Sequence, residues 1–124
     1  MCSPIYLDIG NSSTKWKYAG EYIETRTKEF SLSQLPKSSR IWISNVSSTF
    51  IIENKPNFSI VESQKTYKSL INSYDKPNSL GSDRWLAMIA SYEMNTDSSF
   101  IVIDIGTAIT IDLVDKSGLH MGGV

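Results

Sequence analysis

The sequence has almost none of the residues that build disulfide scaffolds or zinc domains. Its 124 residues include one cysteine, Cys2, and one histidine, His120. A lone cysteine cannot form an internal disulfide, and no Cys/His spacing typical of zinc ligands is present. These absences exclude a disulfide-rich scaffold and a Cys/His zinc fold, and we assign no role to His120.

An excess of charge and long apolar runs are also lacking. Twelve Lys and Arg residues stand against 13 Asp and Glu residues, which gives a formal net charge of −1. No basic run supports nucleic-acid binding. No apolar run is long enough to span a bilayer, and the N-terminus lacks the pattern of a secretory signal. We therefore expect no nucleic-acid partner, no membrane partner and a cytoplasmic protein.

What is present is an ordinary globular composition, 40% hydrophobic and 20% charged, in a chain of single-domain length. Apolar or alternating stretches predict strands at 21–30, 40–46 and 58–62. Polar stretches predict one helical turn within 31–39 and short helices at 47–56 and 64–73. Strands that alternate with short helices predict an α/β architecture.

The clearest helix follows a loop at 74–81 that is rich in turn-forming residues. Ser82 is predicted to cap a helix that runs from Asp83 to Met94. Its apolar residues recur at the helical spacing i, i+3, i+4 and i+7, at Trp85, Met88, Ile89 and Tyr92. This spacing predicts one buried face with the tryptophan in the core, and a polar break at 95–99 ends the helix.

One short pattern occurs twice. Residues 5–12 have the sequence Ile-Tyr-Leu-Asp-Ile-Gly-Asn-Ser, and residues 101–108 have Ile-Val-Ile-Asp-Ile-Gly-Thr-Ala. Each copy predicts a strand that turns tightly and returns as a second strand, at 14–18 and 109–114. An acid at the end of a buried strand, beside exposed backbone N–H groups, can hold a metal next to a phosphate. The two aspartates lie 96 positions apart (104 minus 8), so we expect a duplicated fold whose hairpins face one nucleotide.

The duplication predicts two lobes. We expect the first at 1–97, including the helix, and the start of a second at 98–124, with a third short strand at 118–121. A hairpin of about 25 residues is too small to bury a core of its own. Either this segment extends the first lobe or the chain is part of a longer protein, and we expect the second alternative.

Three blocks in this order resemble the type III pantothenate kinases, within the larger group of acetate and sugar kinases, heat-shock ATPases and actins. The blocks are Asp8-Ile9-Gly10-Asn11-Ser12-Ser13-Thr14-Lys15, then Tyr74, Pro77 and Leu80-Gly81-Ser82-Asp83-Arg84-Trp85, then Asp104-Ile105-Gly106-Thr107-Ala108-Ile109-Thr110-Ile111-Asp112. Asp-x-Gly alone also recurs by chance, whereas the middle block is particular to the family. The match covers the whole chain but only about the first half of a usual family member.

The resemblance implies a fold and a reaction. The fold is α/β, a ribonuclease H-like, actin-type ATPase lobe with a mixed sheet and flanking helices, followed by the opening strands of a second, duplicated lobe. The reaction is transfer of the γ-phosphate of ATP to pantothenate, which gives 4'-phosphopantothenate at the first step of coenzyme A biosynthesis. It needs Mg²⁺ or another divalent cation and a monovalent cation, K⁺ or NH₄⁺. The family works as a homodimer, and we expect the isolated 124-residue chain to be inactive.

The resemblance assigns the first block to the nucleotide. Asp8 would hold hydrated Mg²⁺, Gly10 would let backbone N–H groups approach phosphate, and Lys15 would balance the charge of the β- and γ-phosphates. The implied nucleotide-binding residues are Asp8, Ile9, Gly10, Asn11, Ser12, Ser13, Thr14, Lys15 and Thr107. The family usually has threonine where Ser12 stands, but the hydroxyl is kept. Gly-Asn-Ser is also ordinary hairpin-turn chemistry, so this block by itself leaves both interpretations open.

The middle block is assigned to pantothenate by the same resemblance. Asp83 would be the general base for the attacking hydroxyl. In a loose transition state a weak base is enough, so its main contribution would be to orient that hydroxyl. Arg84 would bind the pantothenate carboxylate bidentately. The implied substrate-binding residues are Tyr74, Gly81, Ser82, Asp83 and Arg84. The alternatives are an acid that stabilises a helix N-terminus and an arginine on a helix surface.

The third block would bind cations and phosphate. Asp104 would be the ligand of the monovalent cation, and Thr107 would contact the triphosphate. Asp112, on the returning strand, is predicted to be a polar residue that faces outward, and we give it no role.

Two other functions stay open. One is a non-catalytic accessory or regulatory relative of the family, and the other is a different small-molecule kinase or ATPase of the larger group. A non-catalytic relative has no chemical need to keep Asp8, Asp83, Arg84 and Asp104 together. The Gly-Ser-Asp-Arg block at 81–84 belongs to the substrate side, so it distinguishes pantothenate from other substrates.

Overall fold

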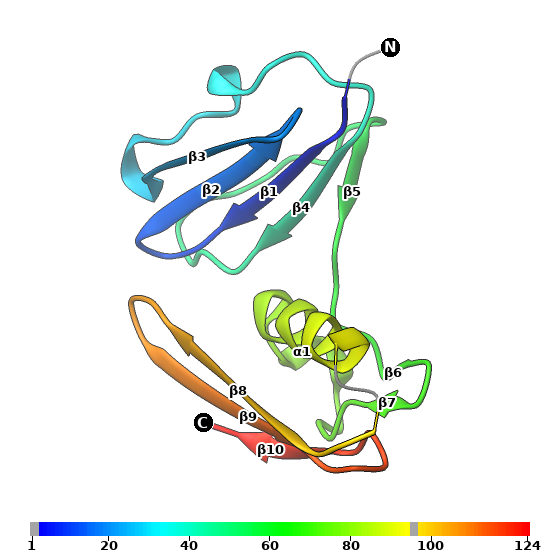
Figure 1. The fold of residues 1–124 in the computed structure, drawn as a ribbon. Helices are drawn as coiled ribbons and strands as arrows, with labels where there is room; N and C mark the ends of the chain where they lie inside the picture. The colour runs from blue at the N-terminus through cyan, green and yellow to red at the C-terminus, as the bar shows by residue number, and fades with distance from the viewer. Residues whose placement is uncertain (1–2, 95–96) are drawn as a thin grey trace. The chain divides into compact units, whose positions relative to one another are not determined.

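A computed structural model describes residues 3–94 and 97–124, so Cys2 and part of the predicted polar break at 95–99 lie outside the described residues. The chain divides into two compact units, Met1–Val61 and Glu62–Val124 (Figure 1). In the parts of the chain that the structure describes, no helix is both long enough and apolar enough to cross a membrane.

The first unit is built on a five-stranded mixed sheet in the order β3-β2-β1-β4-β5 (Figure 1). Its strands are β1 (Ile5–Ile9), β2 (Ser13–Tyr18), β3 (Glu21–Arg26), β4 (Ile41–Asn45) and β5 (Phe58–Ile60). β1, β2 and β3 pair antiparallel, whereas β4 pairs parallel with both β1 and β5. The first predicted hairpin and the strands predicted at 40–46 and 58–62 are confirmed, whereas the strand predicted at 21–30 ends at Arg26 and is followed by a 3₁₀ turn. The chain is of the mixed α/β class, with a mixed sheet.

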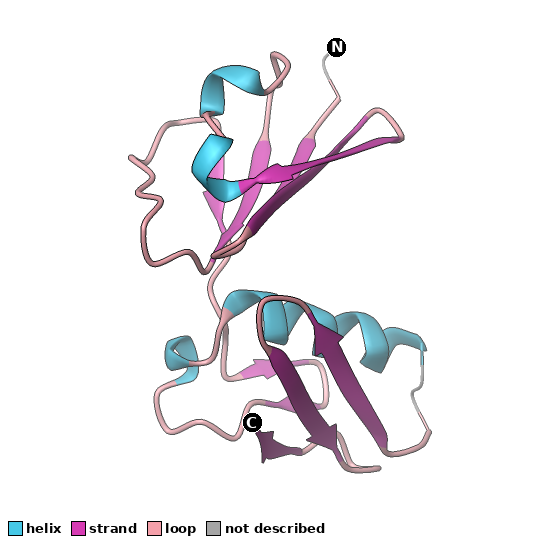
Figure 2. Ribbon diagram, turned by 90° about the vertical axis from the view of Figure 1, so that its left-hand side faces the viewer, coloured by secondary structure: helices cyan, strands magenta, loops and turns pink. Residues whose placement is uncertain are grey.

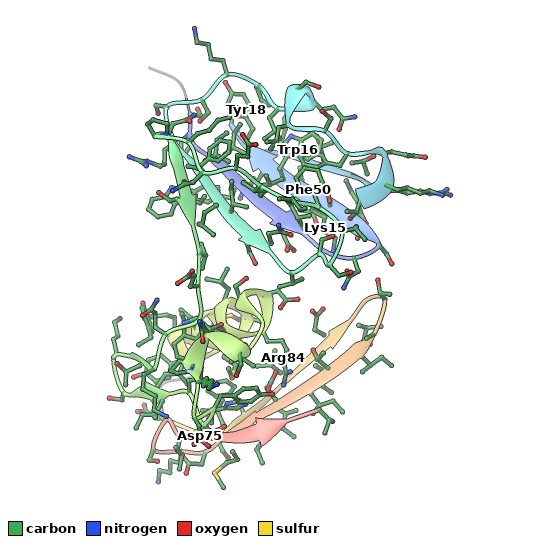
Figure 3. All side chains as sticks on the ribbon, turned by 180° about the vertical axis from the view of Figure 1, so that it is seen from behind. Lys15, Trp16, Tyr18, Phe50, Asp75 and Arg84 are labelled. Atoms are coloured by element: carbon green, nitrogen blue, oxygen red, sulfur yellow. The ribbon has the colours of Figure 1, made fainter. Side chains whose placement is uncertain are left out.

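One face of this sheet carries the core of the first unit. Alternate residues of β1 are buried, as the two-residue period of a strand requires. The buried cluster consists of Ile5, Leu7, Ile9, Trp16, Phe30, Ile41 and Ile43. The ring of Phe30 lies 5.5 Å from that of Trp16 and 5.3 Å from that of Phe50, which closes the cluster over the sheet (Figure 3).

The connections of the first unit are mostly irregular. β2 and β3 are joined by Ala19 and Gly20, both at positive φ, as a two-residue hairpin turn requires. Short 3₁₀ turns follow at η1 (Thr27–Glu29) and η2 (Leu32–Gln34), and η2 confirms the predicted helical turn. The helix predicted at 47–56 is wrong, because no helix lies between β4 and β5. The Ser47 side chain accepts from the backbone N–H groups of Thr49 and Phe50, which is the bonding of a local turn that no helix continues.

The second unit places one helix against an antiparallel sheet. The helix is α1 (Ser82–Met94), and the sheet has the order β10-β9-β8, with β8 (Phe100–Ile105), β9 (Ile109–Val114) and β10 (His120–Gly123). Figure 2 shows α1 lying along the β8–β9 hairpin. A 3₁₀ turn, η3 (Pro77–Ser79), interrupts the predicted loop before the helix.

A second predicted helix, at 64–73, is also wrong. Two short strands, β6 (Thr66–Tyr67) and β7 (Leu70–Ile71), pair antiparallel there. Lys68 adopts a φ of 53°, the left-handed region that a tight turn uses and a helix does not. Tyr67, Leu70 and Ile71 do recur at helical spacing, but the chain pairs these residues across a hairpin that fully buries Leu70.

The core of the second unit confirms the predicted face of α1. The buried cluster contains Leu70, Leu80, Trp85, Met88 and Val114, and the partly buried side chains of Ile89 and Tyr92 pack against it. Because the apolar stripe of α1 packs on β8 and β9, the helix belongs to the same compact unit as the second hairpin. The compact units therefore divide after Val61, which differs from the lobe boundary that we predicted near residue 97.

Candidate functional site

The first Asp-Ile-Gly turn is closed by its own backbone. The N–H of Gly10 donates to the carbonyl of Ser13 at 3.0 Å, at the point where β1 ends with its exposed residue Asp8 and its buried residue Ile9. A Cβ on Gly10 would lie 3.0 Å from the same carbonyl oxygen, so a side chain there would strain the turn. The turn itself therefore favours glycine, apart from the predicted approach of phosphate.

Two threonines brace the turn from inside. Thr14 is fully buried, and its hydroxyl lies 3.0 Å from that of Thr27. Thr27 donates its hydroxyl to the carbonyl of Gly10 at 2.7 Å and its N–H to the carbonyl of Ser12 at 2.9 Å. Of the residues predicted to bind phosphate, Thr14 and Ile9 thus face the interior and hold the turn in shape.

Charged residues line up on the sheet face opposite the core of the first unit. Across β3, β2, β1 and β4 the register places Glu24, Lys15, Asp8 and Ser44 side by side. Opposite charges on neighbouring strands attract each other at this spacing. Lys15 (Figure 3) thus lies between two acidic residues, close to the turn whose phosphate charge it is predicted to balance.

A pocket of about 410 Å³ opens beside the same turn, lined by Asn11, Ser12, Arg26 and Lys28. The side-chain oxygen of Asn11 accepts from the N–H and the hydroxyl of Ser48 at 2.9 and 3.1 Å, so its amide NH₂ is the group that can donate to a ligand. Arg26 and Lys28 bring two positive charges that the sequence did not suggest. Arg26 pairs with Ser13 in the β2–β3 register, and this pairing places Arg26 and the nearby Lys28 beside the turn.

The second Asp-Ile-Gly turn is exposed and short. Asp104 lies near the end of β8, paired with Thr110 of β9, and the N–H of Gly106 donates to the carbonyl of Ala108 at 3.0 Å. Asp104 and Thr107 are both exposed. Within residues 3–94 and 97–124, no three His, Cys, Asp or Glu side chains converge so that they could hold a metal ion. A cation at Asp104 would therefore need carbonyl or phosphate oxygens as its other ligands.

The start of α1 gathers the residues predicted to bind pantothenate. The carbonyl of Gly81 accepts from the N–H of Trp85 at 3.1 Å, and the buried Ser82 is the first residue of the helix. Asp83 is half-buried in the first turn, where its Oδ1 accepts from the N–H of Arg84 at 2.8 Å. The backbone of this turn thus fixes the position of the predicted base.

Asp112 is buried, which corrects the prediction that it faces outward. It is 2% exposed, and its carboxylate accepts two hydrogen bonds from Arg84, from Nε at 2.9 Å and from Nη2 at 2.7 Å. A third contact, 2.8 Å long, joins Asp112 to Nε2 of His120, which is 1% exposed. In Figure 3 the Arg84 side chain extends from α1 toward the strands of its own unit. The arginine is therefore no surface residue, and the histidine has a structural partner.

The pKa values of this pair follow from its hydrogen bonds. Burial by itself raises the pKa of the Asp112 carboxyl, but the hydrogen bonds from Arg84 and His120, together with the charge of Arg84, outweigh it and leave the pKa below its ordinary value. The pKa of Arg84 is raised, chiefly by its hydrogen bond to Asp112. Both groups are charged at neutral pH, as a bidentate ion pair requires.

Tyr74 joins this network through its ring. The ring stacks on the imidazole of His120 with centroids 6.0 Å apart and planes 15° apart, and the Arg84 guanidinium lies 6.0 Å from the centre of the tyrosine ring. Nη1 of Arg84 also donates to the tyrosine hydroxyl at 3.4 Å. The structure thus brings together Tyr74 and Arg84, two residues that are ten positions apart in the sequence.

Comparisons with known proteins agree with the motifs. The model of the family described as type III pantothenate kinase matches residues 5–124. Two curated proteins named type III pantothenate kinase align along nearly the whole chain. The protein from Colwellia psychrerythraea is 32% identical over 96% of this chain, and the one from Hahella chejuensis is 35% identical over 94%. A third, from Cellvibrio japonicus, is 46% identical over 49% of the chain. The chain spans about half the length, 55%, of the first two relatives.

Proposed function

Because this chain belongs to the type III pantothenate kinase family, we propose that the complete protein transfers the γ-phosphoryl group of ATP to the primary hydroxyl of pantothenate. The product is 4'-phosphopantothenate, the first intermediate on the route to coenzyme A. The same family resemblance is the basis for proposing a homodimer, a cytoplasmic location and a monovalent cation, K⁺ or NH₄⁺.

The observation that carries the proposal is the start of α1. An acid and an arginine follow each other there, and Tyr74 lies against the arginine. A carboxylate can accept the proton of an attacking hydroxyl while an arginine binds an anionic group elsewhere on the same molecule. We assign Asp83 as the base and Arg84, Tyr74, Gly81 and Ser82 as the substrate-binding residues.

The first hairpin is proposed to hold the triphosphate. Its exposed Asp8 and the backbone N–H groups of Asn11, Ser12 and Ser13 have the chemistry that a metal-bound phosphate needs, and Lys15 adds positive charge beside them. A divalent cation bound with ATP would neutralise phosphate charge. At the second hairpin, Asp104 would hold the monovalent cation and Thr107 would contact phosphate.

The fold is consistent with an actin-type lobe followed by a duplicate. The strand order β3-β2-β1-β4-β5, with its antiparallel hairpin and parallel crossovers, supports the first lobe. A second hairpin with the same Asp-Ile-Gly turn supports the duplication, because β8 and β9 pair as β1 and β2 do. We propose on this basis that the two hairpins are equivalent parts of two related lobes.

The proposal is tested with the complete gene product. We expect ATP-dependent formation of 4'-phosphopantothenate in the presence of Mg²⁺ and K⁺. The amount of product is measured by mass spectrometry. Asp83→Asn should lower kcat by about a hundredfold or more, because general-base catalysis contributes on that order, and it should leave the affinity for ATP nearly unchanged. A wild-type protein without this activity would refute the proposed function, and lost ATP affinity in Asp83→Asn would contradict the role as base.

A further inference from the structure

We propose that Asp112 and His120 are positioning residues that hold Arg84 so that the outer edge of its guanidinium faces the carboxylate of the substrate. This inference rests on the proposed function, because it concerns how Arg84 binds pantothenate. Both residues lie outside the motifs assigned to the substrate, and neither needs to touch it.

Three of the N–H donors of Arg84 are used within the protein. A guanidinium has five N–H donors. Nε and Nη2 each donate one N–H to Asp112, and Nη1 donates one to the hydroxyl of Tyr74. Two N–H groups remain, one on Nη1 and one on Nη2, and these two nitrogens form the outer edge of the fork. This edge suits bidentate binding of a carboxylate.

The ion pair of Arg84 and Asp112 is mostly buried. The side chain of Asp112 is 3% exposed and that of Arg84 is 17% exposed. The edge of the guanidinium formed by Nε and Nη2 is therefore committed to a buried carboxylate, and a small part of the arginine side chain stays exposed. A pinned arginine loses little freedom when an anion binds, so the cost of ordering it does not fall on the binding step.

His120 holds the Asp112 carboxylate in place. The backbone N–H of Ser73, which can only donate, lies 3.4 Å from Nδ1 of His120, so Nδ1 is the acceptor and the imidazole proton is on Nε2. Nε2 then donates to Oδ1 of Asp112 at 2.8 Å. The hydroxyl of Ser73 also lies 3.0 Å from Nδ1. His120 thus fixes the carboxylate that in turn fixes Arg84.

A hydrolytic triad is a poorer explanation of the same three residues. Ser73, His120 and Asp112 do form a chain of hydrogen bonds. A triad, however, uses its carboxylate to stabilise a protonated imidazole. Here the charge of Asp112 is already balanced by Arg84, and a histidine that is 1% exposed cannot reach a substrate. The network is therefore organised around the arginine.

Gly123 of β10 shows how closely the backbone surrounds the pair. A Cβ at this position would overlap Oδ1 of Asp112 and would lie 2.6 Å from Nη2 of Arg84. Both atoms belong to the same ion-pair contact. A side chain at Gly123 would therefore displace the arginine or the carboxylate. Because this residue is glycine, β10 has room for the ion pair.

The main test is Asp112→Asn in the complete protein. The variant keeps the shape of the side chain but loses its charge and one acceptor. We expect the KM for pantothenate to rise about tenfold or more, since hydrogen bonds between charged groups contribute on that scale, with a smaller change in kcat and in the KM for ATP. Glu93→Gln is the matched control, because Glu93 forms an exposed 2.6 Å ion pair with Lys68 in the same unit, and its kinetics should not change.

A double-mutant cycle separates positioning from general stability. If Asp112 acts through Arg84, Asp112→Asn should have almost no further effect on the KM for pantothenate once Arg84→Ala is present. Effects that simply add would overturn the proposal. If Asp112→Asn does not fold, His120→Gln provides the same cycle, with a smaller expected rise because it removes one of three donors to the carboxylate.

A measurement without turnover keeps this proposal separate from the proposed function. In the wild-type protein the Nε–H of Arg84 should exchange slowly with solvent in ¹⁵N NMR spectra, and Asp112→Asn should speed that exchange about tenfold. If the wild type has no kinase activity but the NMR result holds, the function fails and the positioning stands. If the wild type is a kinase whose pantothenate KM is unaffected by Asp112→Asn, the positioning role is refuted.

Discussion

Gly118 combines a positive φ with a close backbone contact in the second unit. Its φ is +95°, and a Cβ there would overlap the carbonyl of Ser69 and lie 3.3 Å from the nitrogen of Leu70. We expect Gly118→Ala to lower the free energy of unfolding by about 3 kcal/mol, because backbone strain and a steric clash add together. The measurement is urea denaturation followed by circular dichroism.

The control for this prediction is Gly20. It also has a positive φ, +82°, but a Cβ there would meet nothing within 4 Å. Gly20→Ala should therefore cost only the backbone strain, about 1 kcal/mol. Equal losses in the two variants would show that the contact with Ser69 does not matter.

The charge of Asp112 predicts how stability depends on pH. Its pKa in the folded protein is below the ordinary value of 3.8, because the bonds from Arg84 and His120 outweigh the effect of burial. As the pH falls, the unfolded chain takes up this proton first, so the stabilisation is complete above about pH 4 and is lost as the pH falls through the lowered pKa.

The corresponding experiment compares the wild type with Asp112→Asn by urea unfolding between pH 3 and pH 7. We expect the variant to be less stable by about 3 kcal/mol near neutral pH, since it leaves Arg84 without its buried partner. The gap should narrow as the pH falls below about 4, because the unfolded wild-type chain takes up a proton at Asp112 before the folded protein does. A gap of constant size would mean that the charge of Asp112 does not stabilise the fold.

The buried face of α1 could be predicted from the sequence, whereas the buried face of β9 was predicted wrongly. The spacing of Trp85 and Met88 identified the buried face of α1 because the helical period alone determines it. In β9 the aliphatic residues Ile109, Ile111 and Leu113 are exposed, whereas Asp112 and Val114 are buried. Alternation shows that two faces differ, but not which one faces the core, because that depends on Arg84 reaching Asp112 from α1.

The site was predictable where a motif is local and not where partners are far apart. The turn at Gly10 and the start of α1 each lie within a few consecutive residues, so their geometry follows from short sequence patterns. Asp112 is 28 positions from Arg84, and Ser73 is 47 positions from His120. Contacts over such separations depend on how α1 and the strands pack, which no local pattern specifies.

The same packing predicts what a core deletion in α1 will do. Met88 is fully buried in the cluster that joins the helix to Val114 of β9. Met88→Ala should lower the free energy of unfolding by about 2–5 kcal/mol, the usual cost of removing a buried aliphatic side chain. Leu86→Ala, on the exposed side of the helix, is the control and should cost about 0.5 kcal/mol or less. Similar losses in both variants would contradict the assigned face.

One face of the second hairpin, formed by β8 and β9, is apolar and exposed. Three aliphatic pairs lie across β8 and β9, Ile101 with Leu113, Ile103 with Ile111 and Ile105 with Ile109. All six side chains are between 40% and 75% exposed. A continuous apolar patch of this kind on a protein surface usually marks a place where chains associate.

We therefore expect the 124-residue chain by itself to associate with further copies of itself through this face. Ile103→Lys should raise the monomer fraction in sedimentation velocity runs, because a charge at the centre of the patch opposes burial of its neighbours. Tyr22→Lys, which alters a 63% exposed side chain on β3 of the first unit, is the control and should leave the association unchanged. If the chain is monomeric at all concentrations, or if both variants act alike, the β8–β9 face is not the cause. The result matters beyond solubility, because a face that associates in the isolated chain is one that the complete protein has to cover or pair.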